Sequence, residues 1–255
     1  MTRWGISIAF LALLGCTRSS PLPEMQAGES GRVTKIIDGD ALVLDSGQSV
    51  RLVSVLAPVL APRDTAPDPF AGESARILED MALGREVRLY YPGLTRDRYD
   101  RALAHVITID GAGSTVWLNR AMIEHGAARV RLYPSTGKRG QELLALEDAA
   151  RVARKGLWAK PDYQVRDASE IDASARGFHV INGTLGEPLA DASEDRYKPA
   201  CLRALRGVSL KVRVRASARS ACGLANGTPV RLRGWVSEQE LELSHPWHVE
   251  FLDPG

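Results

Sequence analysis

The sequence predicts a mainly β protein with several helices, arranged as two domains. Short strand-like runs separated by glycine turns occur in both halves of the chain, and three segments with helical spacing, each ending at a glycine, lie in the first 160 residues. The 255 residues are 44% hydrophobic and 25% charged, which supplies a core for one large or two small domains and excludes a disordered chain. The formal net charge of +2 favours no class of charged partner.

The first domain is expected over residues 31–160. Glycine turns join the first three strands, and the strand runs are VTKIID, ALVL, QSVRLVSV, REVRLYY and RALAHVITI. Helical spacing is found in PFAGESARILEDMALG, VWLNRAMIEHG and GQELLALEDAARVARKG. Five short strands with one inserted helix and two trailing helices fit an OB-like five-stranded barrel with three helices.

Residues 161–176 are expected to form a linker, and residues 177–255 a second, small β-rich domain with the strand runs FHVINGTL, VSLKVRVRA, TPVRLRGWVS and LELSHPWHVEFL. Alternation places Lys211, Arg213 and Arg215 on one face of the second run. That pattern fits either a stripe along a nucleic-acid backbone or an ordinary solvated face. His245 and His248 are spaced either as two metal ligands or as packed structural side chains.

Residues 1–15 are typical of an export signal, because Arg3 precedes an apolar run too short to span a bilayer. The segment LLGC that ends this run resembles the lipobox of bacterial lipoproteins, which implies lipidation of Cys16. Thr17 resembles the pattern for sorting to the outer membrane, facing the periplasm. The alternative is an ordinary signal peptide with an incidental cysteine. Residues 16–30, rich in Ser, Pro and Gly, are then expected to be a flexible tether.

Two further cysteines, Cys201 and Cys222, form an even pair in what would be an oxidising compartment. A disulfide between them is expected. The alternative is two buried thiols.

Five motifs occur in one order with matching gaps: VTKIIDGDALVL, VRLVSVLAP, TRDRYDRALAHV, WLNRAMIEHGAARV and ALEDAARVARKGLWA. Together they resemble the thermonuclease family of staphylococcal nuclease-like proteins across nearly all of residues 31–160, and the C-terminal part resembles an extension of some bacterial members. The resemblance implies a calcium-dependent phosphodiesterase that hydrolyses DNA and RNA.

The resemblance also assigns roles to individual residues. Asp40 matches a metal-binding aspartate, and Arg51 and Arg101 match the catalytic arginines that hold the phosphate and stabilise its developing charge. Tyr99 matches a tyrosine that contacts the nucleotide, and Arg98 matches a neighbouring basic residue.

The departures from the family pattern concern the acids. Leu56 stands where the family has a second metal-binding acid, and Val59 stands where it has the glutamate that positions the attacking water. Ala57 replaces a residue whose backbone oxygen reaches the metal. Asp64 and Asp68 are candidate substitute acids on the following proline-rich loop. Calcium binding is therefore expected to be weakened or lost, because this ion prefers six to eight oxygen ligands.

The sequence thus favours a secreted, degraded nuclease that still binds phosphate or nucleic acid. One alternative is an active calcium-dependent phosphodiesterase that uses a substitute acid. A further alternative is a non-catalytic protein of the cell envelope that contacts an unidentified protein partner. The sequence leaves open whether the chain is an enzyme.

Overall fold

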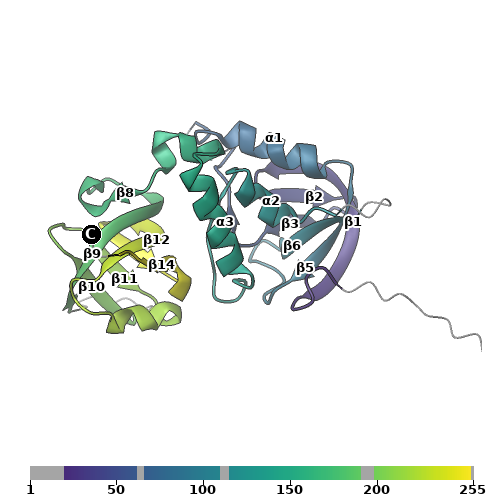
Figure 1. The fold of residues 1–255 in the computed structure, drawn as a ribbon. Helices are drawn as coiled ribbons and strands as arrows, with labels where there is room; N and C mark the ends of the chain where they lie inside the picture. Colours follow the sequence, from purple (N-terminus) through teal and green to yellow (C-terminus); the bar gives the residue numbers. More distant parts are fainter. Residues whose placement is uncertain (1–19, 62–65, 110–114, 191–197, 254–255) are drawn as a thin grey trace, which may run out of the picture.

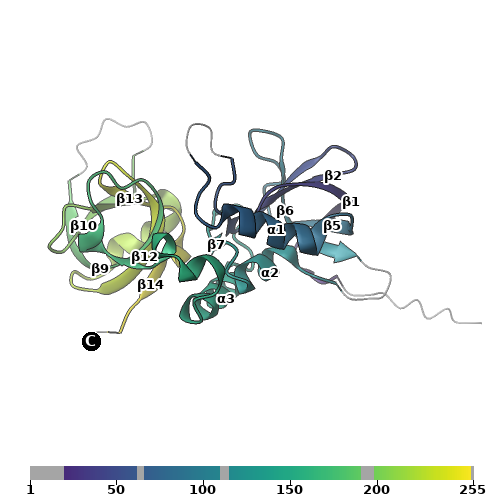
Figure 2. The ribbon, with the colours of Figure 1, turned by 90° about the horizontal axis from the view of Figure 1, so that it is seen from above.

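The computed structural model describes residues 20–61, 66–109, 115–190 and 198–253, and it shows two lobes side by side (Figure 1). The first lobe contains a barrel with its helices, and the second is built mostly of strands. Figure 2, which views the molecule from above, shows the same separation, with helix α3 (Gly140–Val152) close to the second lobe.

The first barrel consists of five strands in the closed order β1-β2-β3-β6-β5, which confirms the expected OB-like barrel. Only β3 and β6 run parallel; the other neighbours are antiparallel. The strands are β1 (Gln26–Asp38), β2 (Ala41–Leu44), β3 (Ser49–Leu52), β5 (Glu86–Tyr91) and β6 (Ala102–Ile109). Two short strands, β4 (Val55–Leu56) and β7 (Arg129–Val130), pair beside the barrel.

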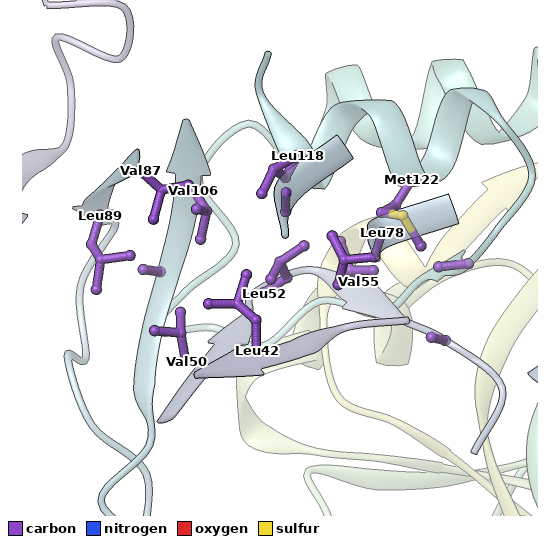
Figure 3. Packing of buried hydrophobic residues seen from close by; sticks show 14 of the residues in the cluster. Leu42, Val50, Leu52, Val55, Leu78, Val87, Leu89, Val106, Leu118 and Met122 are labelled. Carbon is purple, nitrogen blue, oxygen red and sulfur yellow. The ribbon is translucent and has the colours of Figure 1, made fainter. Parts of the chain in front are cut away.

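The barrel core is closed by helices α1 (Ala71–Ala82) and α2 (Leu118–Glu124). Figure 3 shows side chains of the strands, among them Leu42 and Leu52, directed toward Leu78 of α1 and Met122 of α2. These side chains are fully buried, and each contributes about 1.5–3 kcal/mol to folding. Alternation along the strands therefore specifies which face enters the core.

The second barrel repeats the strand order of the first. Strands β9 to β13 pair in the order β12-β13-β11-β10-β9, and β12 also pairs with β9, so the ring closes. The third and fifth strands, β11 and β13, again form the parallel pair. The strands are β9 (Gly177–Leu189), β10 (Cys201–Leu205), β11 (Lys211–Val214), β12 (Pro229–Ser237) and β13 (Glu240–Leu243), with β8 (Arg166–Asp167) and β14 (Val249–Phe251) at the edges. The predicted β-rich domain is thus a second OB-like barrel.

Two expected connecting segments are packed rather than free. The first barrel begins within the expected tether, because β1 starts at Gln26 and Leu22 and Met25 are buried against Tyr90. Cys16 and the signal lie outside the described residues. The expected linker 161–176 buries Tyr163, Ala168 and Ile171, and its strand β8 pairs with β9. Apolar side chains in both segments explain why the structure corrects these boundaries.

The second barrel contains a disulfide between Cys201 of β10 and Cys222, as expected, with Cα atoms 5.9 Å apart. No helix in the described part of the chain is long and apolar enough to cross a membrane.

A buried polar cluster holds the two barrels together. Glu147 of α3 forms an ion pair with Arg233 of β12, and its Oε1 atom accepts a 2.6 Å hydrogen bond from the Val130 N–H. Nearby, the Leu132 N–H donates to His248 Nε2 at 3.0 Å. Burial, with smaller effects of neighbouring cations, lowers the pKa of His248 to about 2, so Nε2 stays unprotonated and accepts this bond. His248 is therefore a structural residue of the junction.

We expect Arg233→Ala to lower the free energy of unfolding by about 3–5 kcal/mol, because it leaves the Glu147 carboxylate buried without its cation. Urea denaturation of the full chain measures this loss. Arg215→Ala, which breaks the partly exposed pair with Glu242, is the matched control and should cost about 1 kcal/mol or less. Equal losses in the two variants would contradict a special role for the junction pair.

Candidate functional site

The two arginines expected to hold phosphate lie on β3 and just before its neighbour β6, and they line one cavity of about 250 Å³. Arg51 belongs to β3, and Arg101 directly precedes β6. Because β3 and β6 are parallel and Arg51 pairs with Leu103, both guanidinium groups reach the same rim of the barrel. The lining residues of this rim cavity are Arg51, Leu52, Val53, Ser54, Val55, Leu94, Asp97, Arg101, Leu103, Arg131, Tyr133, Ser135 and Thr136.

Asp40 directly precedes β2 and forms an ion pair with Arg51. The turn before it depends on Gly39, where a Cβ atom would lie 1.9 Å from Ser74 Oγ. Asp38 has the structural role of a turn residue, since its Oδ1 accepts the Asp40 N–H at 3.1 Å. The Asp40 side chain is only 2% exposed, and its Oδ2 accepts 2.9 Å hydrogen bonds from Arg51 Nη2 and from the Ala57 N–H.

This environment changes the acidity of Asp40. Burial raises its pKa to about 7, against the opposing attraction of Arg51, and the nearby Asp38 carboxylate raises it further. The second oxygen, Oδ1, is buried and has no hydrogen-bond partner among the described residues. Asp40 therefore keeps one buried oxygen without a hydrogen-bond partner among the described residues.

The described residues do not fit a calcium ion at this position. Calcium takes six to eight oxygen ligands, whereas Asp40 offers one free oxygen and its other oxygen is held by Arg51. Within residues 20–61, 66–109, 115–190 and 198–253, no three His, Cys, Asp or Glu side chains gather so that they could hold a metal.

The loop before β6 positions Arg101. Asp97 Oδ2 accepts hydrogen bonds from Arg101 Nε at 2.8 Å and Nη2 at 2.7 Å, while Oδ1 accepts the Tyr99 and Arg101 N–H groups. Burial opposes these bonds, but together they lower the pKa of Asp97. Tyr99 is 65% exposed, with Arg98 and Arg101 against its ring at 4.7 and 5.6 Å. Tyr99 and Arg98 lie outside the rim cavity, on its flank.

Leu56 and Val59, the positions at which the resemblance implies acids, have different surroundings. Leu56 lies in an apolar cluster at the junction with Trp158, Tyr163 and Phe178. Val59 is 41% exposed, and its N–H donates to Asp68 Oδ2 at 2.8 Å. The candidate acid Asp68 is thus held beside Val59, whereas Asp64 lies outside the described residues.

Sequence reasoning missed several residues of the rim cavity, among them Arg131 and Tyr133, which follow β7. The Arg131 guanidinium lies 4.8 Å from the centre of the Tyr133 ring. The alternation of arginine and tyrosine in ARVRLY was the signal that could have revealed them.

The basic stripe of the second domain has acidic partners. Arg213 pairs with Glu240 at 2.5 Å, and Arg215 pairs with Glu242 at 3.5 Å. These pairs favour the solvated-face interpretation of the stripe.

The barrel and its rim define a class: OB-like barrels, whose strand surfaces bind oligonucleotides or oligosaccharides. A model of the family described as Staphylococcal nuclease homologue matches residues 49–160. The chain is 30% identical to "Thermonuclease" of Staphylococcus intermedius over 139 residues, 52% of this chain and 78% of the relative. It is 25% identical to "Thermonuclease" of Staphylococcus hyicus over 162 residues, 60% of this chain and 89% of the relative. A "Probable endonuclease" of Phaeosphaeria nodorum is 31% identical over 140 residues, 51% of this chain and 45% of the relative.

These matches show that the chain belongs to the thermonuclease family, as the motifs of the sequence suggested. Its first barrel and helices form a thermonuclease-like nuclease domain.

We expect Asp40 to make stability depend on pH. With a pKa of about 7 in the folded chain and near 3.8 in the unfolded chain, the folded state holds more protons between these values. The free energy of unfolding relative to Asp40→Asn should therefore fall as the pH rises from about 4 to about 7, by about 1.4 kcal/mol per unit of pKa difference at most. Denaturation of both proteins across this range measures the effect. Asp45→Asn, at an exposed carboxylate, is the control; parallel curves for Asp40→Asn and the parent would contradict the raised pKa.

Proposed function

We propose that the chain is a degraded nuclease that binds the phosphates of nucleic acid at the rim cavity and hydrolyses them little or not at all. The observation that supports this proposal is the composition of the cavity: Arg51, Arg101 and Arg131 line it together. A planar guanidinium group donates two hydrogen bonds to a phosphate, so this group of arginines suits a phosphodiester.

Hydrolysis needs a base that activates water, and the residues beside the arginines supply a poor one. Asp97 lines the cavity, but Arg101 and two backbone N–H groups engage it, and its lowered pKa makes it a weak base. Asp40 is buried, and its Oδ2 is held by Arg51 and the Ala57 N–H. Loss of a general base costs about 10² to 10⁴ in rate. Calcium would find few ligands here, so we propose that binding does not require it.

One observation favours a second candidate function, an active phosphodiesterase. The Asp68 carboxylate accepts the N–H of Val59, so an acid lies close to the position of the missing glutamate. In this alternative Asp68 would activate the water in place of that glutamate.

A cleavage and binding assay with fluorescent single-stranded DNA separates the two functions. For the chain from Ser19 onward we expect binding in calcium and in chelator alike, no cleavage, and at least about tenfold weaker binding for Arg51→Ala, which removes a charged donor. Calcium-dependent cleavage that is lost in both Arg51→Ala and Asp68→Asn would instead establish the phosphodiesterase.

Variants that introduce an acid at position 59 or 56 also test the proposal that cleavage has been lost. Val59→Glu is the appropriate first variant because Val59 is exposed. Leu56→Asp would place a carboxylate in the apolar cluster with Trp158 and Phe178, so the double variant must first be shown to fold. Cleavage gained by either variant, with Val59→Gln as control, would show that the remaining machinery is intact.

We also propose that the chain is an exported lipoprotein anchored through Cys16, on the outer membrane facing the periplasm. The apolar leader and LLGC motif support this, and the Cys201–Cys222 disulfide fits an oxidising compartment. Labelling with a radioactive fatty acid in a bacterial host should mark the parent and not Cys16→Ser. Equal labelling of both proteins, or none of the parent, would contradict the anchor.

A further inference from the structure

Arg131 joins the rim cavity to a second cavity on the other barrel. The second cavity, of about 320 Å³, is lined by Arg131, Trp235, Ser237 and Glu242. Trp235 and Ser237 belong to β12, and Glu242 to β13, which pairs with it. The Arg131 guanidinium lies 4.8 Å from the Tyr133 ring and 5.2 Å from the Trp235 ring, so it contacts an aromatic ring on either side of the boundary between the barrels.

Trp235 lies at the surface, with the Arg131 guanidinium against its ring. Burial alternates at this end of β12: Trp235 is 45% exposed, whereas the next residue, Val236, is fully buried. The adjoining turn at Glu238 and Gln239 connects the fourth and fifth strands of the second OB-like barrel. In OB folds the corresponding loop contributes to oligonucleotide binding.

The charges of the second cavity favour a base over a phosphate. Glu242 lines it and pairs with Arg215 at 3.5 Å, so a phosphate would meet a carboxylate there. Arg131, in contrast, has no carboxylate partner within ion-pair distance among the described residues. A nucleotide whose phosphate binds Arg131 and whose base stacks on the Trp235 ring would place the phosphate next to a cation and the base in the second cavity. Indole rings stack bases without regard to sequence.

From this arrangement we propose that Trp235 and Arg131 form a second nucleotide subsite, through which a single strand of nucleic acid continues from the rim cavity onto the second barrel. The inference rests on the proposed binding function. It adds a surface that lies outside the thermonuclease domain and makes affinity depend on the length of the strand.

The test compares two probes without terminal phosphates, a thymidine dinucleotide and the twelve-residue oligothymidylate dT12, by NMR titration of the full chain from Ser19 onward. We expect Trp235→Ala to weaken dT12 binding roughly 5- to 150-fold and to leave dinucleotide binding unchanged. Trp235→Phe should retain most of the affinity. The indole signal of Trp235, identified by its loss in Trp235→Phe, should shift with dT12 and not with the dinucleotide.

Phe251→Ala is the matched control, since Phe251 is an exposed aromatic residue of the same barrel that lines neither cavity. Melting curves of all variants establish that the junction is intact. If Arg51→Ala weakens the binding of both probes but Trp235→Ala binds dT12 like the parent, the second subsite is overturned and the proposed function stands. If neither probe binds, the proposed function fails, and the subsite fails with it.

Discussion

The buried contact between Glu147 and Arg233 sets the relation between the two barrels, and with it the shape of the site. Glu147 accepts the Val130 N–H and also holds Arg233, so one carboxylate fixes strand β7 of the first lobe and strand β12 of the second. Arg131 is the next residue after Val130, and Trp235 lies on the same face of β12 as Arg233. The contact therefore aligns the arginine of one lobe with the indole of the other.

The apolar residue at position 56 is part of this junction. Leu56 packs with Trp158 and Phe178 between the two barrels. Arg129, which pairs with Leu56 across β4 and β7, lies between the rings of Tyr163 and Phe178 and donates to the Phe178 carbonyl at 2.6 Å. An apolar residue at position 56 thus stabilises the attachment of the second barrel.

Features that depend on local pattern were predictable from the sequence, and features that depend on distant contacts were not. The first barrel, its helices and the positions of Arg51 and Arg101 follow from alternation, glycine turns and motif order. The closure of the second barrel depends on pairing between β9 and β12, which are separated by residues 190–228 and joined by no turn signal. Likewise, nothing local showed that Leu22 and Met25 pack on the barrel, or that Arg131 reaches Trp235.

The distribution of partners among the three arginines decides where an anion is attracted most. Arg51 shares its charge with Asp40, and Arg101 shares its charge with Asp97, so both groups are positioned but partly neutralised. Arg131 contacts the faces of two aromatic rings, whose attraction for a cation is weaker than that of a carboxylate. The excess positive charge of the rim cavity therefore lies at its border with the second barrel. Under the proposed function, this charge distribution would hold a strand across both barrels rather than concentrate charge on one phosphate for cleavage.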